Sequence, residues 1–182
     1  MSVKRRQSMN NVKVTLEEVV RHFLRTQSHK PELKGKDIPE LSLRDAKQLI
    51  EQEYQTIAEK MMRCDWRLCF VDESLFEALK ALCTRTWWDL SDGTLRIVDV
   101  AKNIMEKQEE ILEGYAPTRR KVLDLMNLTT SELFDWRIIV QFDEEDYTVL
   151  DGTCRAVAMA HHFSQHGFSP FLAYIGFTKT EL

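Results

Sequence analysis

The sequence predicts an α+β protein in which a helical N-terminal part packs on a small mixed β-sheet. Apolar residues recur every three or four positions through most of the first two thirds of the chain, the spacing typical of amphipathic helices. In the last third the pattern changes to the alternation typical of half-buried strands. Apolar residues make up 43% of the 182 residues and charged residues 30%, with few Gly and Pro. This composition indicates a folded, mainly helical protein.

The N-terminal quarter is predicted to hold one helix between less regular segments. A helix should begin after Thr15, because Glu18 follows at the spacing of a capping box. The Pro- and Gly-containing stretch 28–41 is predicted to be a loop or linker. We therefore divide the chain into residues 1–41, a flexible tail, helix and linker, and residues 42–182, a single α+β domain.

The strongest helical signal begins at Ser42. Apolar residues then follow at three- or four-residue spacing along one continuous stripe, which a partner surface must cover. The members of this stripe are Leu43, Ala46, Ile50, Tyr54, Ile57 and Met61. After it, residues 66–71 are short, apolar and aromatic enough for a strand, and Asp72 or Ser74 can cap a helix that carries Leu75, Phe76, Leu79 and Leu82.

The middle of the chain contains a turn followed by a helix. The pair Asp92-Gly93 marks the turn, and apolar spacing from Ile97 predicts a helix that Gly114 can end. Trp87 and Trp88 lie beside the turn. We interpret them as buried packing anchors, with a binding surface as the alternative.

The C-terminal third is predicted to run strand, hairpin, strand, corner, helix, strand. A helix over 118–126 and a further turn from Thr130 or Ser131 come before it. Apolar residues alternate in 136–142 and predict the first strand, which a polar "DEED" turn connects to an antiparallel partner strand that runs up to residue 150. A helix then begins at Thr153 and ends at Gly167, and "PFLAYIGF" is predicted to be a buried strand.

The corner between the last hairpin strand and the following helix has the chemistry of an anion site. The first N–H groups of a helix have no partner within it, and the helix dipole adds positive potential there. Thr153 offers a hydroxyl, Arg155 a fork of donors, and Gly152 room for a ligand to approach. Asp151 could orient the turn, pair with Arg155 or assist a metal ion. The alternative is an ordinary turn with Thr153 as N-cap and Arg155 as a surface charge.

The run "YTVLDGTCRAVAMAHHF", with "WRIIVQF" before it and "SPFLAYIG" after it, resembles the signature region of the ParB and sulfiredoxin superfamily. The resemblance covers residues 134–178 and implies a ParB/sulfiredoxin-like sheet. It also implies that Asp151, Gly152, Thr153, Cys154 and Arg155 form a nucleotide- or phosphate-binding corner.

The match departs from the superfamily at two points. Sulfiredoxins place a reactive cysteine directly after the glycine, where this chain has Thr153, so sulfiredoxin activity is not expected. The thiol of Cys154, at a helix N-terminus beside Arg155, should have a lowered pKa, although its favoured role is to fill a gap in the core. The chromosome-partition members carry an arginine-rich box and a following helix-turn-helix domain, which this sequence does not show.

Several further residues have weaker claims to function. His162 and His166 have the spacing of two metal ligands on one helix, but no third ligand is recognisable, so no metal site is predicted. If the protein transfers phosphoryl groups, Asp72, Glu73 and Asp89 are candidate bases. The segment 117–121, "PTRRK", is a possible phosphate contact, with a solvated helix start as the alternative.

Composition also bears on partners. The net charge of −4 argues against broad electrostatic capture of nucleic acid, although Lys4, Arg5 and Arg6 form a basic arm. The four scattered cysteines suggest neither zinc nor disulfides, and no membrane span or signal peptide is evident, so a cytoplasmic location is expected. Oligomeric state is not indicated.

The sequence thus predicts a protein that binds a nucleotide, for example ATP with Mg²⁺, or another phosphate ligand at residues 151–155. Phosphoryl transfer or nucleotide hydrolysis is left open. The alternative is a non-catalytic interaction or regulatory protein, of bacterial or viral origin, that retains only the fold.

Overall fold

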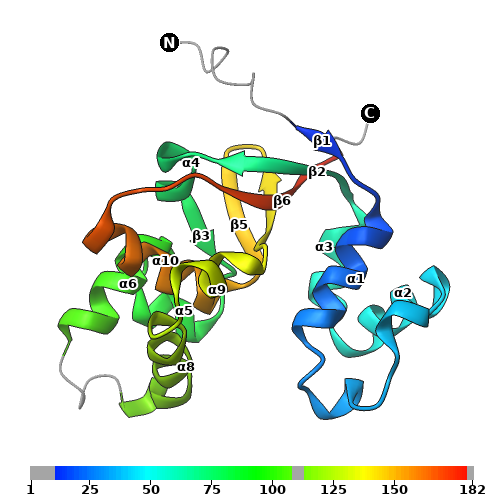
Figure 1. Cartoon of the computed structure of the whole chain (residues 1–182), viewed down its shortest axis with the longest axis horizontal. Coiled ribbons are helices and arrows are strands. Elements are labelled where there is room, and N and C mark those ends of the chain that lie inside the picture. Colours follow the sequence, from blue (N-terminus) through cyan, green and yellow to red (C-terminus); the bar gives the residue numbers. More distant parts are fainter. Residues whose placement is uncertain (1–10, 108–112, 180–182) are drawn as a thin grey trace.

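A computed structural model describes residues 11–107 and 113–179, and these residues form an α+β fold around a six-stranded mixed sheet (Figure 1). The strands are β1 (Val12–Lys13), β2 (Cys64–Val71), β3 (Leu79–Ala81), β4 (Ile139–Asp143), β5 (Asp146–Asp151) and β6 (Phe171–Thr178). The helices are α1 (Leu16–Thr26), α2 (Leu43–Glu53), α3 (Gln55–Met62), α4 (Glu73–Glu77), α5 (Arg85–Leu90), α6 (Ile97–Glu106), α8 (Ala116–Met126), α9 (Thr130–Asp135) and α10 (Thr153–His166). Short 3-10 helices are η1 (Pro31–Leu33), η2 (Ile38–Glu40) and η3 (Glu113–Tyr115).

The sheet has the order β1-β2-β6-β4-β5-β3. The predicted hairpin is confirmed, since β4 and β5 pair antiparallel around a turn in which Glu144 has a φ of 52°. The C-terminal strand β6 lies inside the sheet, antiparallel to β2 and parallel to β4. The edge strand β3 pairs parallel to β5, so Leu79 lies in a strand and not in the predicted helix, which ends at Glu77.

Helices cover both faces of the sheet. On β4 to β6, neighbouring residues alternate between two hydrophobic clusters, as the pleat requires. Val140, Val149 and Ile175 belong to the cluster shared with α6, α8 and α10. Ile139 and Leu150 belong to the cluster shared with α1, α2 and α3. The N-terminal helices α1 to α3 therefore pack on the sheet face opposite α10. In Figure 1 they lie to the right of α8 and α9.

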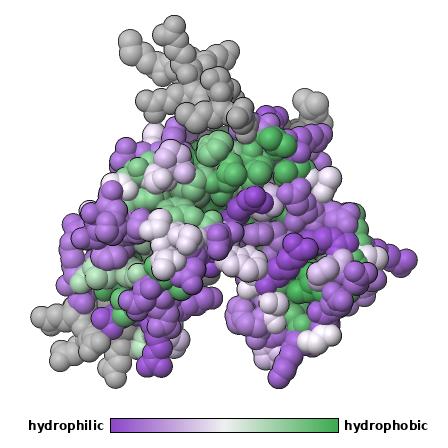
Figure 2. Space-filling view, viewed as in Figure 1, coloured by the Kyte–Doolittle hydropathy of each residue, from purple (hydrophilic) through white to green (hydrophobic). Residues whose placement is uncertain are grey.

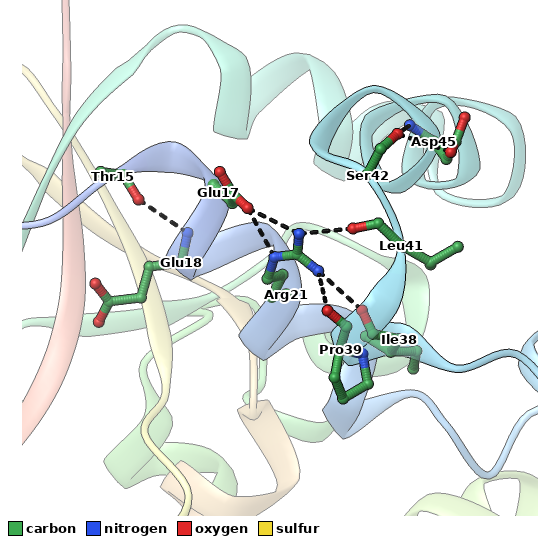
Figure 3. Close-up of polar contacts among 9 residues, drawn as sticks. All are labelled: Thr15, Glu17, Glu18, Arg21, Ile38, Pro39, Leu41, Ser42 and Asp45. Atoms are coloured by element: carbon green, nitrogen blue, oxygen red, sulfur yellow. Dashed lines mark hydrogen bonds and ion pairs between the residues drawn. The ribbon is translucent and has the colours of Figure 1, made fainter.

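The segment that follows α1 is held by one arginine (Figure 3). The Arg21 guanidinium donates two hydrogen bonds to a carboxylate oxygen of Glu17, at 2.9 and 2.8 Å. It also donates to the carbonyl oxygens of Ile38 and Pro39, both at 3.0 Å, and of Leu41 at 2.6 Å. The stretch 28–41, which was predicted as a loop or linker, thus contains two 3-10 helices, and the Arg21 hydrogen bonds attach it to α1.

Most of the predicted helix starts are confirmed, and side chains cap the two that follow Thr15 and Ser42. Thr15 accepts from the backbone N–H of Glu18 at 3.2 Å, and Ser42 accepts from that of Asp45 at 3.1 Å. The apolar stripe after Ser42 is interrupted at Tyr54, whose φ of −141° and ψ of 44° separate α2 from α3. Helical spacing continues on both sides of this break, so the pattern alone does not reveal it.

Two predictions in the middle of the chain need correction. The helix that begins at Ile97 ends at Glu106 rather than near Gly114, and residues 108–112 of the predicted helix lie outside the described residues. Trp87 packs against the core, but Trp88 is 50% exposed and is not a buried anchor. None of the helices within the described ranges has the length and apolar character needed to span a membrane.

Candidate functional site

The corner predicted from the sequence is formed by the end of β5 and the start of α10. Gly152 is the N-cap residue, with a φ of 87° and a ψ of 19°. A Cβ on this glycine would lie 2.8 Å from Cγ2 of Ile138. The turn and its contact with Ile138 therefore require glycine, whereas the sequence interpretation assigned it to ligand access.

The first turn of α10 is not capped by a side chain, because the N-cap residue is glycine. The N–H groups of Thr153, Cys154 and Arg155 precede the first helical hydrogen bond, which joins the Ala156 N–H to the Gly152 carbonyl oxygen at 2.8 Å. These groups and the positive end of a helix 14 residues long face the same side of the corner. Local structure therefore provides donors for an anion.

The corner opens into a cleft of about 560 Å³ that is lined by all five predicted residues. The opposite wall consists of the end of α1 and the residues after it, 25–30, and Lys121 and Leu125 of α8 also line the cleft. In Figure 2 the surface is hollowed between the part that contains α8 and the part formed by α1 to α3. Residues far apart in the sequence thus meet around the corner.

The cleft is strongly cationic. Its basic side chains come from four separate segments, and they are Arg25, Lys30, Lys121, Arg137 and Arg155. Within the described part of the chain, none of the five forms an ion pair with a carboxylate. Asp151 is the one acidic residue among the described residues that line the cleft. The local positive charge contrasts with the chain's net charge of −4.

The carboxylate of Asp151 connects the corner to α1. Its two oxygens accept hydrogen bonds from the Thr26 hydroxyl at 2.7 Å and from the Gln27 amide at 2.9 Å. Asp151 does not pair with Arg155, one of the roles considered from the sequence. It holds the two walls of the cleft together.

Arg155 is only lightly held within the protein. Its guanidinium donates to the carbonyl oxygens of Leu133 at 3.4 Å and Trp136 at 3.5 Å, long distances for such bonds. Partial burial lowers the pKa of the guanidinium, which the Asp151 carboxylate counteracts. The side chain keeps its charge at neutral pH. Most of its hydrogen-bonding capacity is thus available for a ligand.

Cys154 differs from the expectation of a lowered thiol pKa. Burial raises the pKa, and the nearby Lys121 ammonium only partly offsets this effect. The side chain packs against the core cluster beneath α10. The gap-filling role is therefore the one that the geometry favours, and the helix N-terminus does not activate this thiol.

The other candidates lie elsewhere. Asp72 caps α4 by accepting from the Leu75 N–H at 2.8 Å, and Asp89 accepts from the Tyr115 hydroxyl. Glu73 lines a separate cavity. None of these three carboxylates lines the cleft, so the structure does not bring a candidate base to the corner from among them.

The two remaining weak candidates, the segment 117–121 and the histidine pair, have different outcomes. Of the segment 117–121, Lys121 lines the cleft. The rings of His162 and His166 lie 4.6 Å apart, but among the described residues no group of three metal-ligating side chains forms around them.

Sequence reasoning missed several residues that line the cleft outside the corner. Arg25, Lys30 and Arg137 reach the corner from α1, from the segment after it and from the chain before β4. Trp136, which is 43% exposed, also lines the cleft. Arg25, Lys30 and Arg137 look like ordinary surface side chains in their own segments, because only the tertiary fold brings them together. Trp136 was predicted to begin a half-buried strand, but β4 begins at Ile139 and Trp136 lies at the end of α9.

Comparison of the chain with protein-family models, with curated proteins and with solved structures finds no match.

Proposed function

We propose that this protein binds a nucleotide or another phosphate ligand in the cleft at residues 151–155. The observation that carries the proposal is the convergence of four further cationic side chains on the corner whose residues the sequence singled out. The resemblance of that corner to the ParB and sulfiredoxin superfamily supports the same conclusion.

Each part of the cleft has a role in this proposal. A phosphate group lies at the N-terminus of α10, where it accepts hydrogen bonds from the backbone N–H groups and from Thr153. Arg155 supplies a two-pronged contact and Lys121 a point charge from α8. Arg25 and Lys30 approach from the opposite wall, so a ligand with more than one phosphate contacts both walls.

The proposal is for binding rather than phosphoryl transfer. Transfer to a small molecule requires a group that positions or deprotonates the nucleophile. Asp151 is the one carboxylate among the described lining residues, and both of its oxygens accept hydrogen bonds from α1. A carboxylate held in this way is suited to fixing the cleft walls.

Thermal unfolding with added ligand tests the proposal. The four common nucleoside triphosphates, pyrophosphate and inorganic phosphate are added with and without Mg²⁺. A ligand present at about 100 times its Kd stabilises the protein by about 2.7 kcal/mol. Arg155→Ala and Lys121→Ala should each weaken binding about tenfold, the loss of a charged hydrogen bond.

Arg44→Ala is the matched control, because Arg44 is an exposed cation on α2 outside the cleft. It changes the net charge equally and should leave binding unaltered. The proposal is overturned if none of the phosphate compounds increases the stability of the protein. It is also overturned if the Arg155 variant binds as tightly as the wild type.

A further inference from the structure

A second and larger cavity adjoins the cleft. It has a volume of about 920 Å³ and lies between the α2–α3 junction and the segment that runs from β3 into α5. Tyr54 and Ile57 line both cavities. The two hollows are therefore neighbours, with the junction of α2 and α3 in the wall of each.

Strand β5 runs along both cavities. Asp146 and Thr148 line the second cavity, and Leu150 and Asp151 line the cleft. Residues 146, 148 and 150 face the same side of the sheet, because side chains alternate along a strand. Five residue steps of about 3.3 Å give a path of roughly 17 Å along the strand. We refer to the two cavities together as the β5 groove.

Aromatic side chains occur at both ends of the β5 groove and at its middle. Trp136 lies in the cleft, Tyr54 at the junction and Trp88 in the second cavity. The Tyr54 ring is already packed, since the Lys30 ammonium lies over it at 4.7 Å and the Phe23 ring meets it at 5.0 Å between centroids. Trp88 is 50% exposed, and a Cβ on Gly93 would lie only 3.1 Å from its Cζ2 atom. The indole therefore rests against a glycine backbone while much of its surface is open to solvent.

Basic side chains continue along the groove. Lys60 and Lys80 line the second cavity, in addition to the five cations of the cleft. Lys60 donates to Oε1 of Gln141 at 3.2 Å, and Lys80 forms an ion pair with Asp146 at 2.6 Å. Among the described residues that line the second cavity, Lys60 and Lys80 are balanced by Glu53 and Asp146, and Lys80 and Asp146 neutralise each other, so the excess positive charge of the groove lies in the cleft.

We infer that the β5 groove binds a short single-stranded nucleic acid, whose phosphates lie along the cations of the cleft and whose bases stack on the exposed indoles of Trp136 and Trp88 at the two ends of the groove. Unpaired strands require both cations and exposed aromatic rings, since every base has a face for stacking and every phosphate a charge. This inference rests on the proposed function, because one phosphate of the strand occupies the N-terminus of α10.

The arrangement fits a single strand better than other anions. A duplex hides its base faces within the stack and gains nothing from separated aromatic platforms. An acidic peptide without aromatic residues supplies charge, but it does not supply flat groups for the two exposed indoles. The acidic net charge of the whole chain limits binding outside the groove.

Fluorescence anisotropy with end-labelled oligonucleotides tests the inference. The probes are a di-, a tetra- and an octanucleotide of deoxyuridylate, the matching uridylates, a hairpin duplex and a labelled polyglutamate. Affinity should increase with length from the di- to the octanucleotide and fall as salt concentration rises. The DNA and RNA series show whether the groove prefers one sugar.

Two variants separate the two ends of the groove. Trp88→Ala should weaken octanucleotide binding by about tenfold, the loss of one stacked base, and leave dinucleotide binding unchanged. Arg155→Ala should weaken both. Trp88→Phe keeps a ring and should restore most of the octanucleotide affinity. Lys102→Ala, an exposed cation on α6 outside the groove, is the charge control. Circular dichroism confirms that each variant is folded.

The outcomes distinguish this inference from the proposed function. If mononucleotides bind through Arg155 but affinity does not grow with length, the inference is overturned and the proposed function stands. If Trp88 governs octanucleotide binding while no small phosphate compound binds, the proposed function is overturned. If polyglutamate or the duplex binds as tightly as the octanucleotide, the nucleic-acid inference is overturned. Lys60→Ala serves as a second groove variant should Trp88→Ala fail to fold.

Discussion

The two ends of α10 are each marked by a glycine with positive φ, yet they differ in surroundings. At the N-terminal end, Gly152 leads into a cleft with cations and open N–H groups. At the C-terminal end, before Gly167, the ring of Phe163 lies 5.1 Å from that of Phe76 and 4.7 Å from that of Phe168, measured between centroids. One end is thus packed into the aromatic core, whereas the other leaves polar donors open to the cleft in which we propose that a ligand binds.

The largest expected effect is at the aromatic end. Phe163→Ala removes a ring that is 9% exposed and contacts four other phenylalanine rings. The variant should lower the free energy of unfolding by about 3–5 kcal/mol, as measured by urea denaturation. Met105→Ala, at an exposed position of α6, should change it by less than about 0.5 kcal/mol. A similar small loss for Phe163→Ala would contradict the structural role of this end.

The next effect is at Gly152. Gly152→Ala imposes left-handed backbone strain of about 1–2 kcal/mol and a clash with Ile138 of about 1–3 kcal/mol. Gly35→Ala shares the positive φ but has open space, so it should cost only the backbone strain. Urea denaturation measures both losses.

A double-mutant cycle identifies the cause. Ile138→Leu removes the Cγ2 methyl group that the new Cβ would meet, so the double variant should recover part of the stability lost in Gly152→Ala. Strict additivity of the two changes would show that the contact with Ile138 is not what excludes alanine.

Asp151→Asn should affect stability and binding in opposite directions. The asparagine amide keeps one neutral oxygen and replaces the other with an NH2 donor, so one of the two hydrogen bonds from Thr26 and Gln27 is lost and the other is weakened, which lowers the free energy of unfolding by about 1–2 kcal/mol. Removal of a negative charge from a cationic cleft should strengthen the binding of pyrophosphate without added metal. Calorimetric titration and urea denaturation measure the two effects, and Glu51→Gln on α2 is the control. Weaker binding instead would indicate that Asp151 contacts the ligand or a metal that accompanies it.

The smallest effect concerns the thiols and leaves stability unchanged. Burial raises the pKa of Cys154, so little thiolate forms at neutral pH and its fraction grows only as pH rises towards that raised value. Burial raises the pKa of Cys64 and Cys69 to about 11 in the same way. Mass spectrometry after brief iodoacetamide treatment should find Cys83, which is exposed, labelled first. Labelling of Cys154 at the same rate would restore it as a reactive residue.

Much of the C-terminal third could be predicted because its signals are local. The hairpin, the corner and the end of α10 each depend on residues close in sequence, such as Gly152 and Gly167. The strand β3 could not be predicted in this way. It has only three residues, and its partner β5 lies far along the chain.

The site could be predicted only in part, for the same reason. The corner residues carry a local signature, whereas Arg25 and Lys30 at the end of α1 resemble solvated charges. Their place in the cleft depends on how α1 docks, through the Asp151 contacts and through His22, whose ring nitrogen lies 2.8 Å from the carbonyl oxygen of Arg137. No local pattern encodes a contact between residues so distant in sequence.

The position of β6 within the sheet has a consequence for the order of folding. In β2, Cys64 pairs with Thr178 and Val71 with Phe171, so β2 joins β4 only through the last strand described. Contacts of such high sequence separation form slowly, because a long loop must close before they are gained. During synthesis, the edge of β2 that pairs with β6 therefore stays unpaired until β6 leaves the ribosome. Truncation before residue 171 leaves β2 and β4 without the strand that joins them.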